Sequence, residues 1–312
     1  MTEDNPVAKP ELPSTKNLRR QFAWFALFLF GLTLAFGKPL LAMLKYSWLT
    51  DLHSHATLIP FISVYLIWLQ RDRLRQTSCA SPALAIAPLA AGLVALKAIL
   101  VPSDELTAAQ PNDYLALTTF CYLCFLWAGA LLFLGGHFFR QHLFPLVFLA
   151  FMVPLPTIAE NAVEMFFQHT SADAAHGLFK LAGLTLYREG LQFDLPGTSF
   201  RVAKECSGIR SSLVLFITSL LAGHLFLKTY PRRVALALFV IPLAIVRNGF
   251  RIFTIGMLCV YVSPDMIDSP IHHRGGPVFF ALSLIPFFLL LLWLRRGELR
   301  RKADSSPQVE KA

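Results

Sequence analysis

The stretch VALALFVIPLAIVRNGFRIFTIGML, residues 234–258, decides how this chain folds. It is mostly apolar, and its only charged or amide side chains, Arg247, Asn248 and Arg251, stand in its second half. An α-helix needs about 20 mostly apolar residues to cross the hydrocarbon core of a bilayer, so this stretch is predicted to be a membrane-spanning helix. Charged side chains inside such a helix are costly, which marks Arg247 and Arg251 as candidates for a functional site.

Similar apolar runs recur along the rest of the chain. Of its 312 residues, 55% are hydrophobic and only 15% are charged, whereas soluble domains carry roughly 25% charged residues. The sequence therefore predicts an all-α polytopic membrane protein. Its eight spans are predicted at residues 21–44, 56–70, 83–101, 113–134, 142–156, 209–227, 234–258 and 277–294.

Basic residues gather in every second connection between these spans. The positive-inside rule makes that side cytoplasmic, so both termini are predicted to lie inside. Residues 1–20 and 296–312 are then cytoplasmic tails around a membrane domain at 21–295. This placement also explains the net charge of +9, so the predicted partner is the lipid bilayer and not nucleic acid. The basic clusters are Lys16, Arg19 and Arg20; Arg71, Arg73 and Arg75; Arg140; Lys228, Arg232 and Arg233; and Arg295, Arg296, Arg300, Arg301 and Lys302.

One long insertion, residues 157–208, falls on the opposite side. Its first half is predicted to be an amphipathic helix at the outer interface, because Thr157 and Glu160 form a capping-box pattern and Glu160, Glu164 and Gln168 share one face. Its second half is predicted to be a β-hairpin, because apolar residues alternate on both sides of a Pro-Gly turn. The hairpin residues are Leu191, Phe193, Leu195, Pro196, Gly197, Phe200 and Val202.

The hairpin leads directly to Cys206, at the outer end of the span at 209–227. Ser207 is positioned to cap that helix, and Arg210 follows one turn later. A helix N-terminus and a nearby arginine both favour the thiolate form of cysteine. Cys206 is therefore a candidate nucleophile, although a buried structural thiol has the same sequence pattern.

The other four cysteines have a simpler interpretation. Cys121 and Cys124 form a Cys-x-x-Cys pair inside an apolar run, and Cys259 has a similar setting. Such cysteines behave as small buried hydrophobic residues. Cys79 has no nearby partner in the sequence.

The last outer connection contains adjacent histidines, His272 and His273, followed by Gly276. Imidazole can act as general acid or base, a thiolate as nucleophile, and a guanidinium can stabilise a developing oxyanion. Cys206, Arg251 and a histidine are all predicted at the outer face, and together they form the parts of an acyl-transfer site. The histidines lack a clear third metal ligand, so neither a metal nor another cofactor is predicted.

The chain resembles the exosortase/archaeosortase family. The resemblance rests on Cys206-Ser207-Gly208-Ile209-Arg210-Ser211, on Asn248-x-x-Arg251 and on His272-x-x-x-Gly276, in that order, and covers roughly residues 20–295. It implies a membrane cysteine transpeptidase with Cys206 as nucleophile, Arg251 as transition-state stabiliser and His272 in proton transfer. His273 departs from the family pattern and leaves the choice of histidine open, with the Gly276 spacing favouring His272.

The resemblance also implies a setting and a substrate. The enzyme would sit in the bacterial inner membrane with its site outside the cytoplasm. It would cleave exported proteins that carry a C-terminal PEP-CTERM-like tail of motif, span and basic end, often in connection with exopolysaccharide production. The acceptor that resolves the thioester stays open. Two alternatives are a membrane transferase or transporter for lipid-linked glycans, in which Arg247 and Arg251 bind phosphate, and a non-catalytic factor in polysaccharide assembly.

Overall fold

A computed structural model describes residues 15–50, 52–71, 81–101, 111–204, 207–269 and 275–304. The chain divides into two compact units, Met1–Thr157 and Ile158–Ala312. Within the described ranges, five helices are long and apolar enough to cross a membrane. The number rises to seven if two helix pairs, Arg19–Ala35 with Gly37–Leu49 and Leu143–Met152 with Thr157–Leu181, each form one span. This chain is an all-α, multi-pass membrane protein with a small β-sheet.

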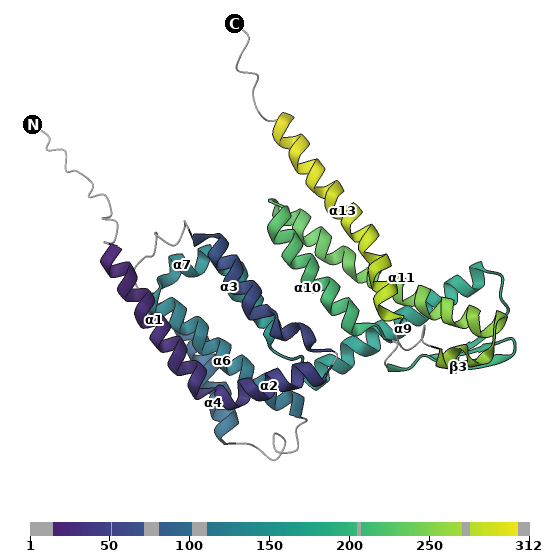
Figure 1. Ribbon diagram of the computed structural model, residues 1–312, viewed down its shortest axis with the longest axis horizontal. Helices are drawn as coiled ribbons and strands as arrows, with labels where there is room; N and C mark the ends of the chain where they lie inside the picture. Colours follow the sequence, from purple (N-terminus) through teal and green to yellow (C-terminus); the bar gives the residue numbers. More distant parts are fainter. Residues whose placement is uncertain are drawn as a thin grey trace, which may run out of the picture. The chain divides into compact units, whose positions relative to one another are not determined.

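The first unit is built around helix α6 (Figure 1). α4 and α1 pack against α6, and α3 packs against α8. The predicted spans at 56–70 and 142–156 correspond to shorter helices than expected. The elements of this unit are α1 (Thr15–Ala35), α2 (Gly37–Leu49), η1 (Ser54–Thr57), α3 (Ile59–Leu69), α4 (Pro82–Leu100), α6 (Pro111–Phe133), α7 (Gly135–Gln141), α8 (Leu143–Phe148) and η3 (Leu149–Met152).

The predicted single span at 21–44 is instead two helices. α1 and α2 meet at Phe36 with a bend of 71°. Pro39 lies in the first turn of α2, where a missing backbone N–H is tolerated, whereas inside a continuous helix it would break a hydrogen bond. The proline therefore favours a new helix start over one uninterrupted span.

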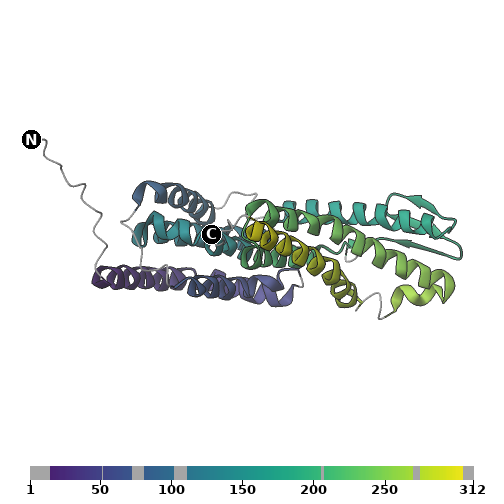
Figure 2. The ribbon, with the colours of Figure 1, turned by 90° about the horizontal axis from the view of Figure 1, so that it is seen from above.

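The second unit combines helices with the sheet. α10, α11 and α13 lie against one another (Figures 1 and 2), and α11 is 32 residues long. At ~1.5 Å per residue it measures about 48 Å, more than the ~30 Å hydrocarbon core. The elements are α9 (Thr157–Leu181), β1 (Tyr187–Glu189), β2 (Gln192–Leu195), β3 (Thr198–Arg201), α10 (Ile209–Phe226), α11 (Tyr230–Tyr261), η5 (Pro264–Asp268) and α13 (Gly276–Asp304).

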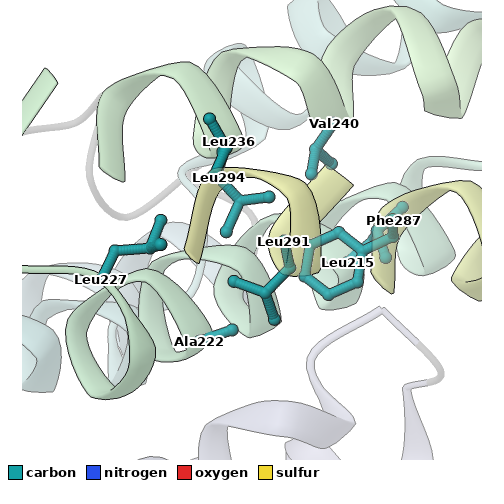
Figure 3. Close-up of a cluster of buried hydrophobic side chains, with 8 residues drawn as sticks. All are labelled: Leu215, Ala222, Leu227, Leu236, Val240, Phe287, Leu291 and Leu294. Carbon is teal, nitrogen blue, oxygen red and sulfur yellow. The ribbon is translucent and has the colours of Figure 1, made fainter. Parts of the chain in front are cut away.

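Two apolar cores hold this unit together. The first joins α10, α11 and α13, and it is shown in Figure 3. The second joins α9, the sheet and α11, with Phe179 and Phe193 fully buried. α11 belongs to both cores, so it fixes the sheet relative to the helix that begins after Cys206. The first core consists of Leu215, Ala222, Leu227, Leu236, Val240, Phe287, Leu291 and Leu294.

Polar contacts of Glu298 connect α13 to the α10–α11 connection. The carboxylate of Glu298 accepts hydrogen bonds from the backbone N–H groups of Lys228 and Thr229, at 2.9 Å each, and from the Thr229 hydroxyl at 2.6 Å. It also pairs with Arg232 at 3.9 Å. Glu298 thus ties the end of α13 to the α10–α11 connection.

The predicted helix and hairpin before Cys206 are both present, with one strand more than expected. β2 and β3 pair around Pro196-Gly197, with Leu195 opposite Thr198. Gly197 has φ +82°, which the tight turn requires and which glycine adopts without steric cost. The additional strand, β1, pairs with β2 on its other edge.

Candidate active site

Gly208 forms the turn from which α10 begins. It is the residue before the first helical position, with φ +71° and ψ 13°, a left-handed conformation that side chains with a Cβ disfavour. Ser207 was expected to cap this helix. Its hydroxyl does accept a hydrogen bond from the Ile209 N–H, but at 3.4 Å, and Gly208 holds the position next to the helix. The glycine of the Cys-Ser-Gly sequence is therefore demanded by the backbone.

The carbonyl oxygen of Gly208 is approached by four hydrogen-bond donors. It accepts hydrogen bonds from the Ser211 hydroxyl at 3.1 Å and from the Ser212 hydroxyl at 2.8 Å. The Ser212 backbone N–H donates to it as well, at 3.0 Å. Nη2 of Arg247, from the middle of α11, approaches it at 3.4 Å and donates to the Ser212 hydroxyl at 3.1 Å. The turn is thus fixed from its own helix and from α11.

Asn248 packs directly on the same turn. It is 2% exposed, and a Cβ added to Gly208 would stand 2.8 Å from the Asn248 Oδ1 and 2.9 Å from its Cγ. Real Cβ atoms essentially never come that close. Two of the sequence motifs, the one that contains Cys206 and the one that contains Arg251, therefore meet at Gly208 and Asn248.

The two arginines of α11 differ in burial. Arg247 is 7% exposed, and its Nη1 is buried without a hydrogen-bond partner among the described residues. Arg251 lies one turn further along the same face and is half-buried. Arg247 makes a structural contact with a backbone carbonyl, that of Gly208.

α9 holds the chain just before Cys206. The amide of Gln168 is buried and donates to the carbonyl of Val202 at 2.7 Å, and Glu164 pairs with Lys204 at 3.8 Å. The face of α9 that was identified by its polar side chains thus binds the end of the hairpin. On another side of the helix, Met165 is 59% exposed.

α11 also packs closely against α9 behind this region. A Cβ added to Gly249 would stand 2.6 Å from the Cβ of Ala174, and one added to Gly256 would stand 2.5 Å from the ring of Phe179. These two glycines are seven residues apart, so they lie on one face of α11. The close approach sets Asn248 and Arg251 relative to α9 and the sheet.

The start of α13 reaches the same part of α11. The rings of Phe250 and Phe279 form an edge-to-face pair with centroids 6.2 Å apart. Phe279 lies three residues after Gly276, and Phe250 is the neighbour of Arg251. The third motif therefore ends beside the second.

Of the three predicted site residues, Arg251 lies within the described ranges. Cys206 and His272, together with His273, lie outside the described residues. Cys121, Cys124 and Cys259 are buried, as expected of core residues, and the Cys121 thiol donates to the Gly92 carbonyl at 3.3 Å. Cys79 is also outside the described part. Among the described residues, no group of three His, Cys, Asp or Glu side chains is arranged to hold a metal ion.

Sequence reasoning did not single out Ser212, nor the contact of Gln168 with Val202. Both residues have short-range signals that are common in any helix, a serine in the first turn and a glutamine on a polar face. Only the tertiary structure shows that Ser212 bonds Arg247 and that Gln168 bonds the segment before Cys206.

Comparison with known proteins identifies one family. No curated protein and no solved structure matches the chain. A family model described as transmembrane exosortase (Exosortase_EpsH) matches residues 48–289, which is most of the chain and includes all three motifs. The chain therefore belongs to the transmembrane exosortase family.

Proposed function

We propose that this protein is a membrane cysteine peptidase and transpeptidase that acts at the outer face of the bacterial inner membrane. The observation that carries the proposal is the meeting of Gly208 with Asn248. It brings the helix that follows Cys206 against the helix that bears Arg251. Family membership supports the same reaction class.

Chain length supports the place of the other two residues. Cys206 is two residues from Gly208, a reach of at most about 7 Å of extended chain, and His272 is four residues from Gly276, a reach of at most about 14 Å. The Phe250–Phe279 pair lies next to Arg251. These constraints favour one site built from the starts of α10 and α13 and the outer part of α11.

The proposed reaction has two steps. The Cys206 thiolate attacks the carbonyl carbon of the scissile peptide bond, and Arg251 stabilises the oxyanion that forms. The carbon–nitrogen bond then breaks, and the leaving amine takes a proton from His272. The upstream protein remains on Cys206 as a thioester. An amine or water next attacks the thioester and gives its proton to His272, and the carbon–sulfur bond breaks to regenerate the thiolate.

The proposed substrates are exported proteins with a PEP-CTERM-like C-terminal tail. A motif placed just before a membrane span would present its scissile bond at the height of the site, and a basic end would anchor the span inside. Confinement of enzyme and substrate to one membrane raises their effective concentration. A link to exopolysaccharide production is part of the proposal.

Processing of a tagged substrate with such a tail tests the function. The Cys206→Ala variant is expected to insert normally and to leave the substrate uncleaved. Cys121→Ala and Cys124→Ala are matched controls, because both thiols are buried in α6, and they are expected to process normally. Complete cleavage by Cys206→Ala would overturn the proposal. It would leave the glycan-transfer and assembly-factor alternatives, which do not need a thiol.

Labelling tests the orientation separately. In a chain whose other four cysteines are replaced by alanine, Cys206 is expected to react with a membrane-impermeant thiol reagent added from the outside. A tag placed after residue 302 should stay protected in the same cells. Reaction of Cys206 from the cytoplasmic side alone would invert the proposed topology.

A further inference from the structure

The guanidinium of Arg247 is buried, and it takes no part in the two reaction steps proposed above. It lies inside a membrane-spanning helix and is 7% exposed. A charge in that environment is costly unless it is paired. Yet the ion pairs of the described residues involve other arginines and lysines, and none includes Arg247. Its positive charge is therefore not neutralised by a carboxylate in that part of the chain.

The hydrogen bonds of Arg247 all lead to the turn at Gly208. Nη2 donates to the Gly208 carbonyl and to the Ser212 hydroxyl, and the same hydroxyl donates to that carbonyl. Arg247, Ser212 and Gly208 thus form a closed set of contacts between α11 and the first turn of α10. A guanidinium has five donors in a fixed plane, so these bonds also fix the direction of the remaining ones.

The other terminal nitrogen of Arg247, Nη1, also points to a partner. It is buried and has no acceptor among the described residues. Buried donors are nearly always satisfied in folded proteins, so a donor held in this way points to an acceptor that the described protein groups do not supply. An anionic or strongly polarised atom is the acceptor that a cationic donor favours.

We infer that Arg247 is a positioning residue of the site, which holds the Gly208 turn and supplies the positive charge that favours the thiolate of the cysteine preceding it. The inference rests on the proposed function of Cys206 as nucleophile. It separates the two arginines of α11, because Arg251 acts on the substrate oxyanion and Arg247 acts on the nucleophile. It also explains why a charge is retained in the interior of the helix.

Other charged groups stand on the elements next to the turn, and their effect must be distinguished from that of Arg247. An exposed charge is screened by solvent and influences a neighbouring thiol less than a buried one. Glu164 and Lys204 pair with each other, which reduces the field of each. The groups on the packed elements are Glu164 of α9, Lys204, Arg210 of α10 and Arg251 of α11, and Glu205, His272, His273 and Arg274 lie outside the described residues.

The test is the pH dependence of Cys206 alkylation. The protein is the full chain in membranes, with Cys79, Cys121, Cys124 and Cys259 replaced by alanine, and the probe is iodoacetamide, which is uncharged and reacts with the thiolate. Arg247→Gln is expected to shift the rate profile to higher pH, so that alkylation near pH 7 slows about tenfold. Arg247→Lys keeps the charge and should stay close to the parent profile.

Two further variants keep the result interpretable. Arg247→Met removes the charge and is more compatible with an apolar helix, so it provides the measurement if Arg247→Gln fails to accumulate. Arg233→Gln is the matched control in the same helix. It lies 14 residues earlier, about 21 Å along the axis, and should leave the profile unchanged.

Unchanged profiles for Arg247→Gln and Arg247→Met would overturn the inference, and so would an equal shift in Arg233→Gln. A profile for Arg247→Lys as slow as that of Arg247→Gln would show that charge is not what Arg247 supplies. Alkylation requires neither substrate nor turnover. The inference can therefore fail while Cys206→Ala still abolishes processing, and complete cleavage by Cys206→Ala would show a failure of the proposed function that the alkylation profiles do not depend on.

Discussion

Gly208 and Asn248 lie so close together that a Cβ atom on Gly208 would stand 2.8 Å from the Asn248 Oδ1. Gly208→Ala must therefore displace Asn248 and also hold alanine at φ +71°, which costs about 1–2 kcal/mol by itself. We expect the processing rate to fall at least tenfold while the protein still inserts. The measurement is substrate cleavage normalised to enzyme abundance in membranes.

Gly177→Ala is the control for this substitution. Gly177 lies inside α9, and a Cβ there would meet nothing within 4 Å. Alanine favours a helix over glycine by up to about 1 kcal/mol, so this variant should process normally and be no less stable. Normal processing by Gly208→Ala as well would show that the contact with Asn248 does not shape the site.

The arginines of α11 should differ in their response to lysine. Arg251→Lys is expected to slow processing by ~100-fold or more, because an ammonium group lacks the planar fork of donors that stabilises an oxyanion. Arg247→Lys should be milder, since it retains the charge near the Gly208 turn. Single-turnover cleavage rates compare the two. The reverse order would assign the oxyanion to Arg247 and leave Arg251 with the positioning role.

The bond from Gln168 to Val202 should contribute to stability. Gln168→Leu leaves the Val202 carbonyl, which now accepts a 2.7 Å hydrogen bond, without this donor. The expected cost is about 1–3 kcal/mol, seen as a lower midpoint of thermal unfolding in detergent. Gln192→Leu is the control, because the Gln192 amide donates to Asp194 at 3.3 Å in an exposed position. Equal midpoints would mean that α9 does not anchor the hairpin end.

The height of the cleavage motif above the membrane should decide whether a substrate is processed. A spacer of about seven polar residues between motif and span lifts the motif by up to ~23 Å if it is extended. We expect this substrate to be cleaved poorly, whereas seven residues inserted before the motif should have little effect. If the substrate with the spacer after its motif is cleaved at an undiminished rate, cleavage does not depend on the height of the motif above the membrane.

Much of the fold could be predicted because its causes are local. The apolar run at 234–258 gives α11, and the alternation around Pro196-Gly197 gives the hairpin. β1 was missed because Tyr187, Arg188 and Glu189 show no alternation of apolar residues. The strand depends on tertiary contacts, since Arg188 pairs with Asp173 at 2.8 Å and lies over the ring of Phe193.

The candidate site was predictable in its residue types but not in its contacts. Both arginines could be identified as candidates, because each is a charged residue in an apolar helix and burial of charge is costly at either position. The sequence could not show that Arg247 reaches the Gly208 carbonyl, which lies 39 residues earlier in the chain. Such a contact depends on how α10 and α11 pack, and helix packing leaves no short motif.

Capture of the covalent intermediate tests the central claim most directly. A substrate tagged on the N-terminal side of its motif is incubated with the enzyme, quenched in acid and examined with and without hydroxylamine, an amine that cleaves thioesters. The account predicts a tagged enzyme adduct that hydroxylamine removes, that accumulates in the wild type, and that is absent in Cys206→Ala. A substrate cleaved at full rate by Cys206→Ala, or an adduct that hydroxylamine leaves intact, would contradict the assignment of Cys206 as nucleophile.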